Sequence, residues 1–154
     1  MTEEIKLRVG NISEVEEKLE QDGEKLQEKK LVDTYFRTEC DSVLKLRESS
    51  SGNLVIRYQP TEQGFEKVLD KKVEKPKEIK TELKDENGIK SILDKEMKFY
   101  SWKEFTVIIN RIKNLGEFLI IEGDEKPDKE LVFEKLNLKN PGIIKVPFSD
   151  LTKQ

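Results

Sequence analysis

Ionisable residues alternate with apolar ones in several short segments of the chain. In the first segment, a β-strand sends Glu4, Lys6 and Arg8 to one face and three apolar side chains to the other. Polar faces of mixed charge recur in later segments, which carry Lys45 and Arg47, Arg57 and Gln59, Glu78, Lys80 and Glu82, and Asn110 and Glu122. If a sheet closes on itself with these faces inward, it forms a polar cavity suited to a metal ion and a polyanion.

The same pattern also fits ordinary strands that keep one face in water. Glu4 and Lys6 would then form a cross-strand ion pair on a wet surface, and Lys45, Arg47 and Arg57 would lie on a solvated strand face. Repetition of the pattern with both signs of charge favours the inward arrangement. From the residues alone, both interpretations stay open.

Composition narrows the function classes. The chain has 154 residues, which suit one domain over 1–154, and its net charge is −3 with 40% charged residues. Acids and bases nearly cancel, so no nucleic-acid partner is expected. The lack of histidine excludes His-based acid–base catalysis and His metal sites. Any metal would be a hard cation on carboxylates, such as Mg²⁺, Mn²⁺ or Ca²⁺.

Cysteine use and hydropathy indicate the compartment. Cys40 is the only cysteine, so no internal disulfide can form and a cytoplasmic protein is expected. The sequence shows no signal peptide and no long apolar run, which argues against secretion and against a membrane partner. The high content of Lys and Glu is typical of thermophiles.

The order of elements predicts an α+β fold. Ser13 and Glu16 form a capping box that opens a helix burying Ile12, Val15 and Leu19. Strands are predicted over 2–9, 30–36, 42–47, 54–59, 78–83, 97–102, 105–113, 117–122 and 143–146, helices through 89–93 and from Pro127, and a mobile loop over 61–76. About eight strands and three helices, mostly antiparallel, indicate an α+β barrel.

Several segments resemble the motifs of one family, in the same order along the chain. Glu4-Ile5-Lys6 is similar to the end of Glu-x-Glu-x-Lys, and Asp33-Thr34-Tyr35-Phe36 to Asp-Thr-Tyr-Phe. Leu44-Lys45-Leu46-Arg47 is similar to Leu-Arg-x-Arg, and Arg57-Tyr58-Gln59 to Thr-Tyr-Lys. The segment 115–122 resembles Leu-Gly-x-Phe-x-Glu-Ile-Glu, and 147–151 resembles a terminal Ser-Tyr-x-x-Leu. Together they resemble the triphosphate tunnel metalloenzymes, or CYTH family, which includes class IV adenylate cyclases and thiamine triphosphatases.

The resemblance implies a fold, a chemistry and a set of site residues. The fold is an eight-stranded antiparallel β-barrel, a tunnel with flanking helices. In it, carboxylates hold Mg²⁺ or Mn²⁺ and basic residues grip a triphosphate. By position, the implied metal ligands are Glu4, Glu122 and Asn110, and the implied substrate-binding residues are Lys6, Arg8, Lys45, Arg47, Arg57 and Lys80. Lys6 and Glu82 are the implied catalytic residues.

The chain also departs from the family pattern, mostly by losing acids. Positions where the family has an acid carry Thr2, Lys80, Asn110 and Ile120, while Lys45 replaces an arginine and Gln59 a lysine. Because ligand charge controls affinity for hard cations, these changes predict weaker metal binding.

Three functions are consistent with these residues. The first is metal-dependent hydrolysis of an inorganic or organic triphosphate, with adenylate cyclase activity less favoured. The second is a non-catalytic tunnel that binds a nucleotide or polyphosphate, and the third is a structural or interaction domain without polyanion affinity. The sequence leaves the oligomeric state open, and a homodimer is one of the partners considered.

Overall fold

Nine antiparallel strands make up the single sheet of the described residues, which are 3–39, 41–62, 64–124 and 129–153 of the computed structural model. Their order in the sheet is β5-β4-β3-β2-β6-β7-β8-β1-β9. The strands are β1 (Glu3–Arg8), β2 (Glu24–Phe36), β3 (Val43–Ser49), β4 (Gly52–Pro60), β5 (Phe65–Lys72), β6 (Ile89–Trp102), β7 (Phe105–Ile112), β8 (Gly116–Gly123) and β9 (Gly142–Ile144). Cys40 and Pro127 lie outside the described residues.

Strand β1 closes the barrel because it pairs on both edges. Along one edge it pairs with β8, and on the other its first residues pair with β5, with Glu4 opposite Phe65. The rest of that edge pairs with β9, where Lys6 lies opposite Ile144. Eight strands therefore close into a barrel, and β9 extends the wall. The predicted α+β antiparallel barrel is confirmed.

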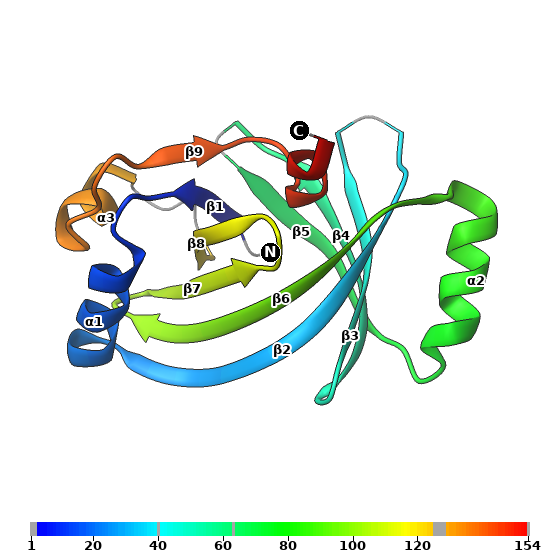
Figure 1. Ribbon diagram of the computed structural model, residues 1–154, viewed down its shortest axis with the longest axis horizontal. Coiled ribbons are helices and arrows are strands. Elements are labelled where there is room, and N and C mark those ends of the chain that lie inside the picture. The colour runs from blue at the N-terminus through cyan, green and yellow to red at the C-terminus, as the bar shows by residue number, and fades with distance from the viewer. Residues whose placement is uncertain (1–2, 40, 63, 125–128, 154) are drawn as a thin grey trace.

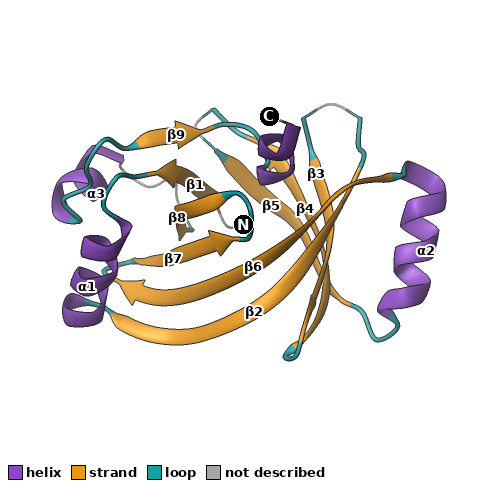
Figure 2. Cartoon of the chain, in the orientation of Figure 1, coloured by secondary structure: helices purple, strands orange, loops and turns teal. Residues whose placement is uncertain are grey.

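Helices cover the barrel from outside (Figure 1, Figure 2). Helices α1 (Ile12–Asp22) and α3 (Lys129–Lys135) lie at one end, and α2 (Pro76–Asn87) stands at the other. The predicted helix face of Ile12, Val15 and Leu19 is confirmed, since all three are buried against outward side chains of β1, β7 and β8. A 3₁₀ turn, Phe148–Lys153, follows β9, and Phe148 packs with the inward core.

Helix α2 replaces the strand predicted over 78–83. Ile79 and Leu83 pack against outward residues of β2 and β3. Their spacing of four fits an alternating strand as well as one helical turn, so it misled the prediction. Pro76 in the first turn and Gly88 at the C-cap, with φ of 82°, fit a helix.

Two further predicted elements are also wrong. The predicted loop over 61–76 contains strand β5, whose alternation is broken by a register shift opposite Arg57 and Tyr58. The predicted helix through 89–93 is the start of β6, which pairs with β2 over nearly its whole length. Non-local pairing decides both segments, because neither has a strong local pattern.

Gly64 sits where β5 approaches β1, and its lack of a side chain allows the closure. A Cβ added there would lie 1.9 Å from the Glu4 carbonyl oxygen, so the backbones would have to separate. We expect Gly64→Ala to lower the free energy of unfolding by about 2 kcal/mol or more, as measured by urea denaturation. Gly142→Ala is the control, since its added Cβ meets nothing nearer than 4.0 Å. Equal stability of the two variants would contradict this account of the closure.

Candidate functional site

A cavity of about 210 Å³ lies inside the barrel. Its wall is built from alternate residues of the strands, which point inward because successive side chains of a strand face opposite ways. The lining residues are Glu4, Lys6, Gln27, Lys29, Lys45, Arg47, Leu54, Ile56, Tyr58, Lys67, Asp70, Lys95, Met97, Phe99, Ile108, Asn110, Ile120, Glu122 and Phe148. The cavity therefore combines several charged groups with apolar side chains.

Three cations of the wall converge on one carboxylate, that of Asp33. Arg47 donates to it from both Nε and Nη2, each at 2.8 Å. Lys95 Nζ lies 2.8 Å and Lys45 Nζ 3.1 Å from Asp33 Oδ2. Lys95 also donates to the Tyr35 hydroxyl at 2.6 Å. The register places Asp33 on β2 between its partners on β3 and β6, so the sheet itself assembles the cluster.

Burial and charge act in opposite directions on this cluster. Burial raises the pKa of Asp33, but the charges of Arg47, Lys45 and Lys95 outweigh it and hold that pKa well below its usual range. Burial lowers the pKa of Lys95 to about 8, although Asp33 opposes the shift. It also lowers the pKa of Lys45 well below its usual value, again against Asp33. Asp33 is thus firmly ionised.

Lys6 is a fourth inward cation, and aromatic rings surround it. Its Nζ lies 4.2 Å from the ring centre of Phe65 and 4.5 Å from that of Phe148. Burial lowers its pKa to about 8, while the nearby carboxylate of Glu4 opposes the shift. The rings stabilise the ammonium group through cation–π contact without neutralising its charge.

Glu4 and Glu122 lie directly opposite one another on β1 and β8. Glu4 is buried, and Glu122 is partly buried. Burial, followed by the charge of Glu4, raises the pKa of Glu122 to about 7. Two carboxylates forced together out of water are a cation-binding arrangement, because a divalent ion relieves the repulsion that otherwise retains a proton.

Asn110 on β7 supplies a further oxygen to the same cavity. It is fully buried, and neither of its side-chain polar atoms has a hydrogen-bond partner among the described residues. An orphaned amide in a polar cavity fits a ligand or cation that binds there. Within the described ranges, no three acidic or cysteine side chains form a metal-binding group. The Glu4–Glu122 pair therefore fits a single hard cation, such as Mg²⁺ or Mn²⁺, better than a pair of cations. Asn110 pairs with Phe118, four residues before Glu122 on β8, so its predicted place as a third ligand of that cation is wrong.

The structure brings six of the predicted site residues to the cavity and leaves four elsewhere. Those lining it are Glu4, Lys6, Lys45, Arg47, Asn110 and Glu122. Arg8 is exposed, and its guanidinium lies 5.2 Å from the Phe118 ring centre. Arg57 was predicted to face inward, but Leu54, Ile56 and Tyr58 occupy that face of β4. The predicted inward face of Arg57 is therefore wrong, because the apolar face of this strand points into the barrel.

Lys80 and Glu82 also lie away from the cavity, because their segment is helix α2 on the outside of the barrel. Lys80 Nζ lies 2.7 Å from a carboxylate oxygen of Glu48, and Glu82 is exposed. Their predicted places on a tunnel strand are wrong. Sequence reasoning in turn missed Asp33 and Lys95 as site residues. Lys95 stands in the inward alternation Leu93, Lys95, Met97, which could have identified it once β6 was read as a strand.

The proton on Glu122 gives a pH prediction for the metal-free protein. The folded carboxyl keeps its proton up to a pKa of about 7, whereas the unfolded carboxyl releases it near 4.5. The unfolded state therefore binds fewer protons in this window, and stability falls as pH rises from 4.5 to 7, by about 2–3 kcal/mol. Urea denaturation in EDTA should show this fall in the native chain and a flatter profile in Glu122→Gln. An unchanged slope in the variant would assign the effect to other groups.

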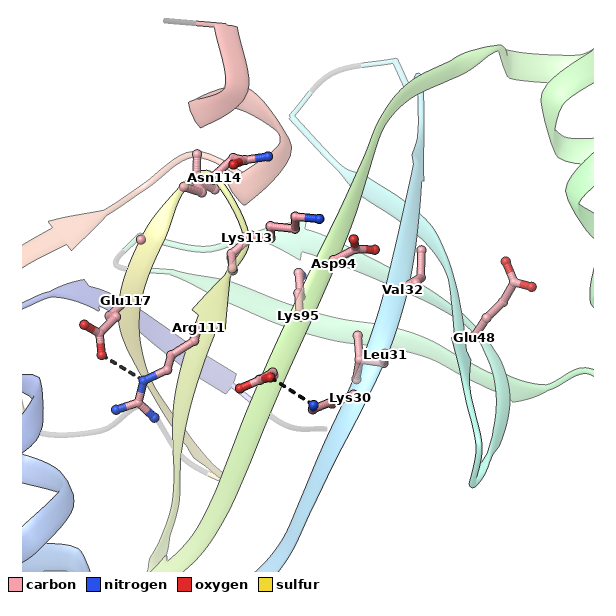
Figure 3. A pocket seen from close by; sticks show the side chains of 14 residues that line it. Lys30, Leu31, Val32, Glu48, Asp94, Lys95, Arg111, Lys113, Asn114 and Glu117 are labelled. Atoms are coloured by element: carbon pink, nitrogen blue, oxygen red, sulfur yellow. Dashed lines mark hydrogen bonds and ion pairs between the residues drawn. The ribbon is translucent and has the colours of Figure 1, made fainter.

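A larger hollow, of about 970 Å³, lies over β2, β6 and the β7–β8 turn (Figure 3). Four of its charged groups form two ion pairs: Lys30 Nζ lies 3.4 Å from a carboxylate oxygen of Glu96, and Arg111 Nε lies 2.8 Å from one of Glu117. These pairs are solvent-exposed, and such pairs bind a further charge weakly. The enclosed cavity is therefore the better candidate for chemistry.

Comparison with known proteins identifies the fold. No family model matches the chain, and no curated protein matches it. A protein from Pyrococcus horikoshii OT3 superposes with a TM-score of 0.84 at 21% identity, covering 98% of this chain and 99% of that one. A candidate adenylate cyclase from Vibrio parahaemolyticus has a TM-score of 0.76 at 16% identity, over 99% and 98% of the two chains.

A third solved structure shares the same fold. It is a candidate adenylyl cyclase from Hippeastrum with a dominant triphosphatase activity, and it matches with a TM-score of 0.61 at 14% identity over 90% of this chain and 89% of that one. These likenesses confirm the fold that the resemblance to the CYTH family implies. None of the helices in the described ranges is long and apolar enough to cross a lipid bilayer.

Proposed function

We propose that this chain is a triphosphate tunnel metalloenzyme of the CYTH family that hydrolyses a triphosphate with the help of one divalent cation. One observation carries the proposal: Lys6, Lys45, Arg47 and Lys95 are all buried in the barrel and face one cavity. Burying four cations is costly unless an anion compensates them, and one carboxylate, Asp33, is shared by three of the four. The remaining positive charge suits a chain of phosphates.

Different side chains of the cavity would bind the phosphates and the divalent cation. Arg47 and the lysines would bind phosphate oxygens by charge-assisted hydrogen bonds. Glu4 and Glu122 would hold Mg²⁺ or Mn²⁺, and the buried amide of Asn110, farther along the wall, would contact the phosphate chain. When bound, the cation would neutralise charge on the phosphate that is transferred to water. The closed wall strengthens each of these interactions by limiting bulk water around the ligand.

A second candidate function is polyanion binding without hydrolysis. Ile108 and Ile120 line the cavity beside the two glutamates, so that part of the wall offers no further ligand for a cation. A tunnel with this wall could retain its phosphate-binding cations and lack a cation site strong enough for turnover.

Phosphate release and calorimetric titration with inorganic tripolyphosphate test the two functions together. Both are measured with Mg²⁺, with Mn²⁺ and with EDTA. Turnover that requires a divalent cation supports the proposed enzyme. Binding without turnover under all three conditions supports the second candidate. Neither binding nor turnover would contradict both and would support a structural role for the barrel.

A further inference from the structure

Asp33 is buried beneath the cations of the cavity and does not line the cavity itself. Its side chain has no exposed surface, while Lys45, Arg47 and Lys95 both contact its carboxylate and line the cavity. No other described carboxylate lies within ion-pair distance of these three cations. Asp33 therefore touches the groups that face a ligand without being placed to touch the ligand.

The contacts of Asp33 hold three cations from the two strands beside β2: Lys45 and Arg47 from β3, and Lys95 from β6. Arg47 is held by two parallel hydrogen bonds, an arrangement that sets the plane of its guanidinium group. Lys95 is oriented by Asp33 and by the Tyr35 hydroxyl together. A long basic side chain held in this way loses less conformational freedom when a ligand binds.

The same contacts oppose the loss of charge that burial causes. A buried ammonium group without a carboxylate tends to release its proton, since desolvation disfavours the charged form. Other groups also act on this cluster: Lys6 and Glu4 from β1, Lys29 from β2 and Tyr58 from β4. These four groups are the same in all the variants compared below, so a difference between the variants reports the effect of Asp33.

We propose that Asp33 is a positioning residue that keeps Lys45, Arg47 and Lys95 charged and aligned as one anion-binding unit in the tunnel. This inference rests on the proposed function for the identity of the ligand. Asp33, which lies behind the site, would then control how polyanion binding depends on pH.

The test compares the native chain with Asp33→Asn by titrating inorganic tripolyphosphate in EDTA between pH 6 and 9. Asparagine keeps the size of the side chain and removes its charge. We expect binding by Asp33→Asn to be at least about tenfold weaker at pH 8, because the lysines then lose their protons. The deficit should shrink as the pH falls to 6, since the lysines regain them. Glu96→Gln, which removes one exposed charge next to Lys95, should bind as the native chain does at each pH.

Two results would overturn the inference. Tighter binding by Asp33→Asn would mean that the Asp33 charge chiefly repels the ligand. A deficit of equal size at every pH would mean structural damage alone. If Asp33→Asn does not fold, Asp33→Glu serves instead: its retained charge should leave the pH profile native in shape while lowering affinity uniformly, and a profile shifted to lower pH would contradict the inference.

A direct titration separates this inference from the proposed function. The ¹³Cε resonances of Lys45 and Lys95 report their protonation without any ligand. Their titration midpoints should move to lower pH in Asp33→Asn, and unmoved midpoints would overturn the inference. If the native chain binds no tripolyphosphate but the midpoints move, the proposed function fails while the charge-keeping role of Asp33 stands.

Discussion

Glu4→Gln is expected to reduce tripolyphosphate hydrolysis by about 100-fold or more while leaving binding of the ligand in EDTA within about threefold of native. Glutamine keeps the shape of the side chain but removes the charge that pairs with Glu122 to hold a cation. Glu122 would then lose its acidic neighbour and titrate closer to its usual pKa. The measurements are steady-state phosphate release at several Mg²⁺ concentrations and calorimetry in EDTA.

Glu3→Gln is the matched control for that substitution. Glu3 precedes Glu4 on β1, and its side chain points to the other side of the sheet. Its loss removes the same charge from the same strand and should leave turnover near native. A comparable loss of turnover in both variants would contradict a cation-holding role for Glu4, and excess Mg²⁺ that fully restores Glu4→Gln would show that its charge affects affinity for the cation alone.

Arg47→Met should weaken tripolyphosphate binding by at least about 30-fold and lower the free energy of unfolding by about 3 kcal/mol. The loss of affinity follows from removing a guanidinium group that lines the cavity. The loss of stability follows because Asp33 keeps only two of its three cationic partners. Calorimetry in EDTA and urea denaturation at pH 7 measure the two effects.

Arg57→Met controls for the loss of an arginine from the same barrel. Arg57 lies on the neighbouring strand β4 but away from the cavity, so its substitution should change affinity by less than about twofold. If Arg57→Met weakened binding as much as Arg47→Met, the effect would come from the overall charge of the chain. If Arg47→Met bound tripolyphosphate normally, the phosphate-gripping role assigned to the cation cluster would be wrong.

Local signals account for the elements that the sequence predicts well. Helix α1 carries its buried residues at helical spacing, and the strands on either side of short turns alternate clearly. The predicted capping box of Ser13 and Glu16 is wrong, because the helix begins at Ile12 with Asn11 as its N-cap and has no side-chain cap hydrogen bond. Helix α2 lacks such clarity, because Ile79 and Leu83 satisfy both periods. The strand β5 is obscured by its register shift, which lets Lys67 and Asp70 both line the cavity despite their odd spacing.

In the candidate site, too, local patterns predict some residues, and non-local strand pairing places the others. Glu4, Lys6, Lys45 and Arg47 occur as alternating pairs within single strands, so their shared faces can be read from sequence. The Asp33–Lys95 contact joins two long strands through their register, which no local pattern encodes. The inward apolar face of β4 is an equally non-local outcome, since polar and apolar faces alternate there as they do in β1.

The pairing of β1 has a consequence for the order in which this protein folds. The strand that carries Glu4 precedes its partners β5, β8 and β9, and long stretches of chain separate it from them. Contacts of such large sequence separation form slowly, because a long loop must be closed before they are gained. During synthesis, strands β2, β3 and β4 can pair with one another before β8, a partner of β1, has been made. We therefore expect that the cluster around Asp33 can form once β6 has been made, whereas the Glu4–Glu122 pair also needs β8, so the cation-holding end of the tunnel is completed later.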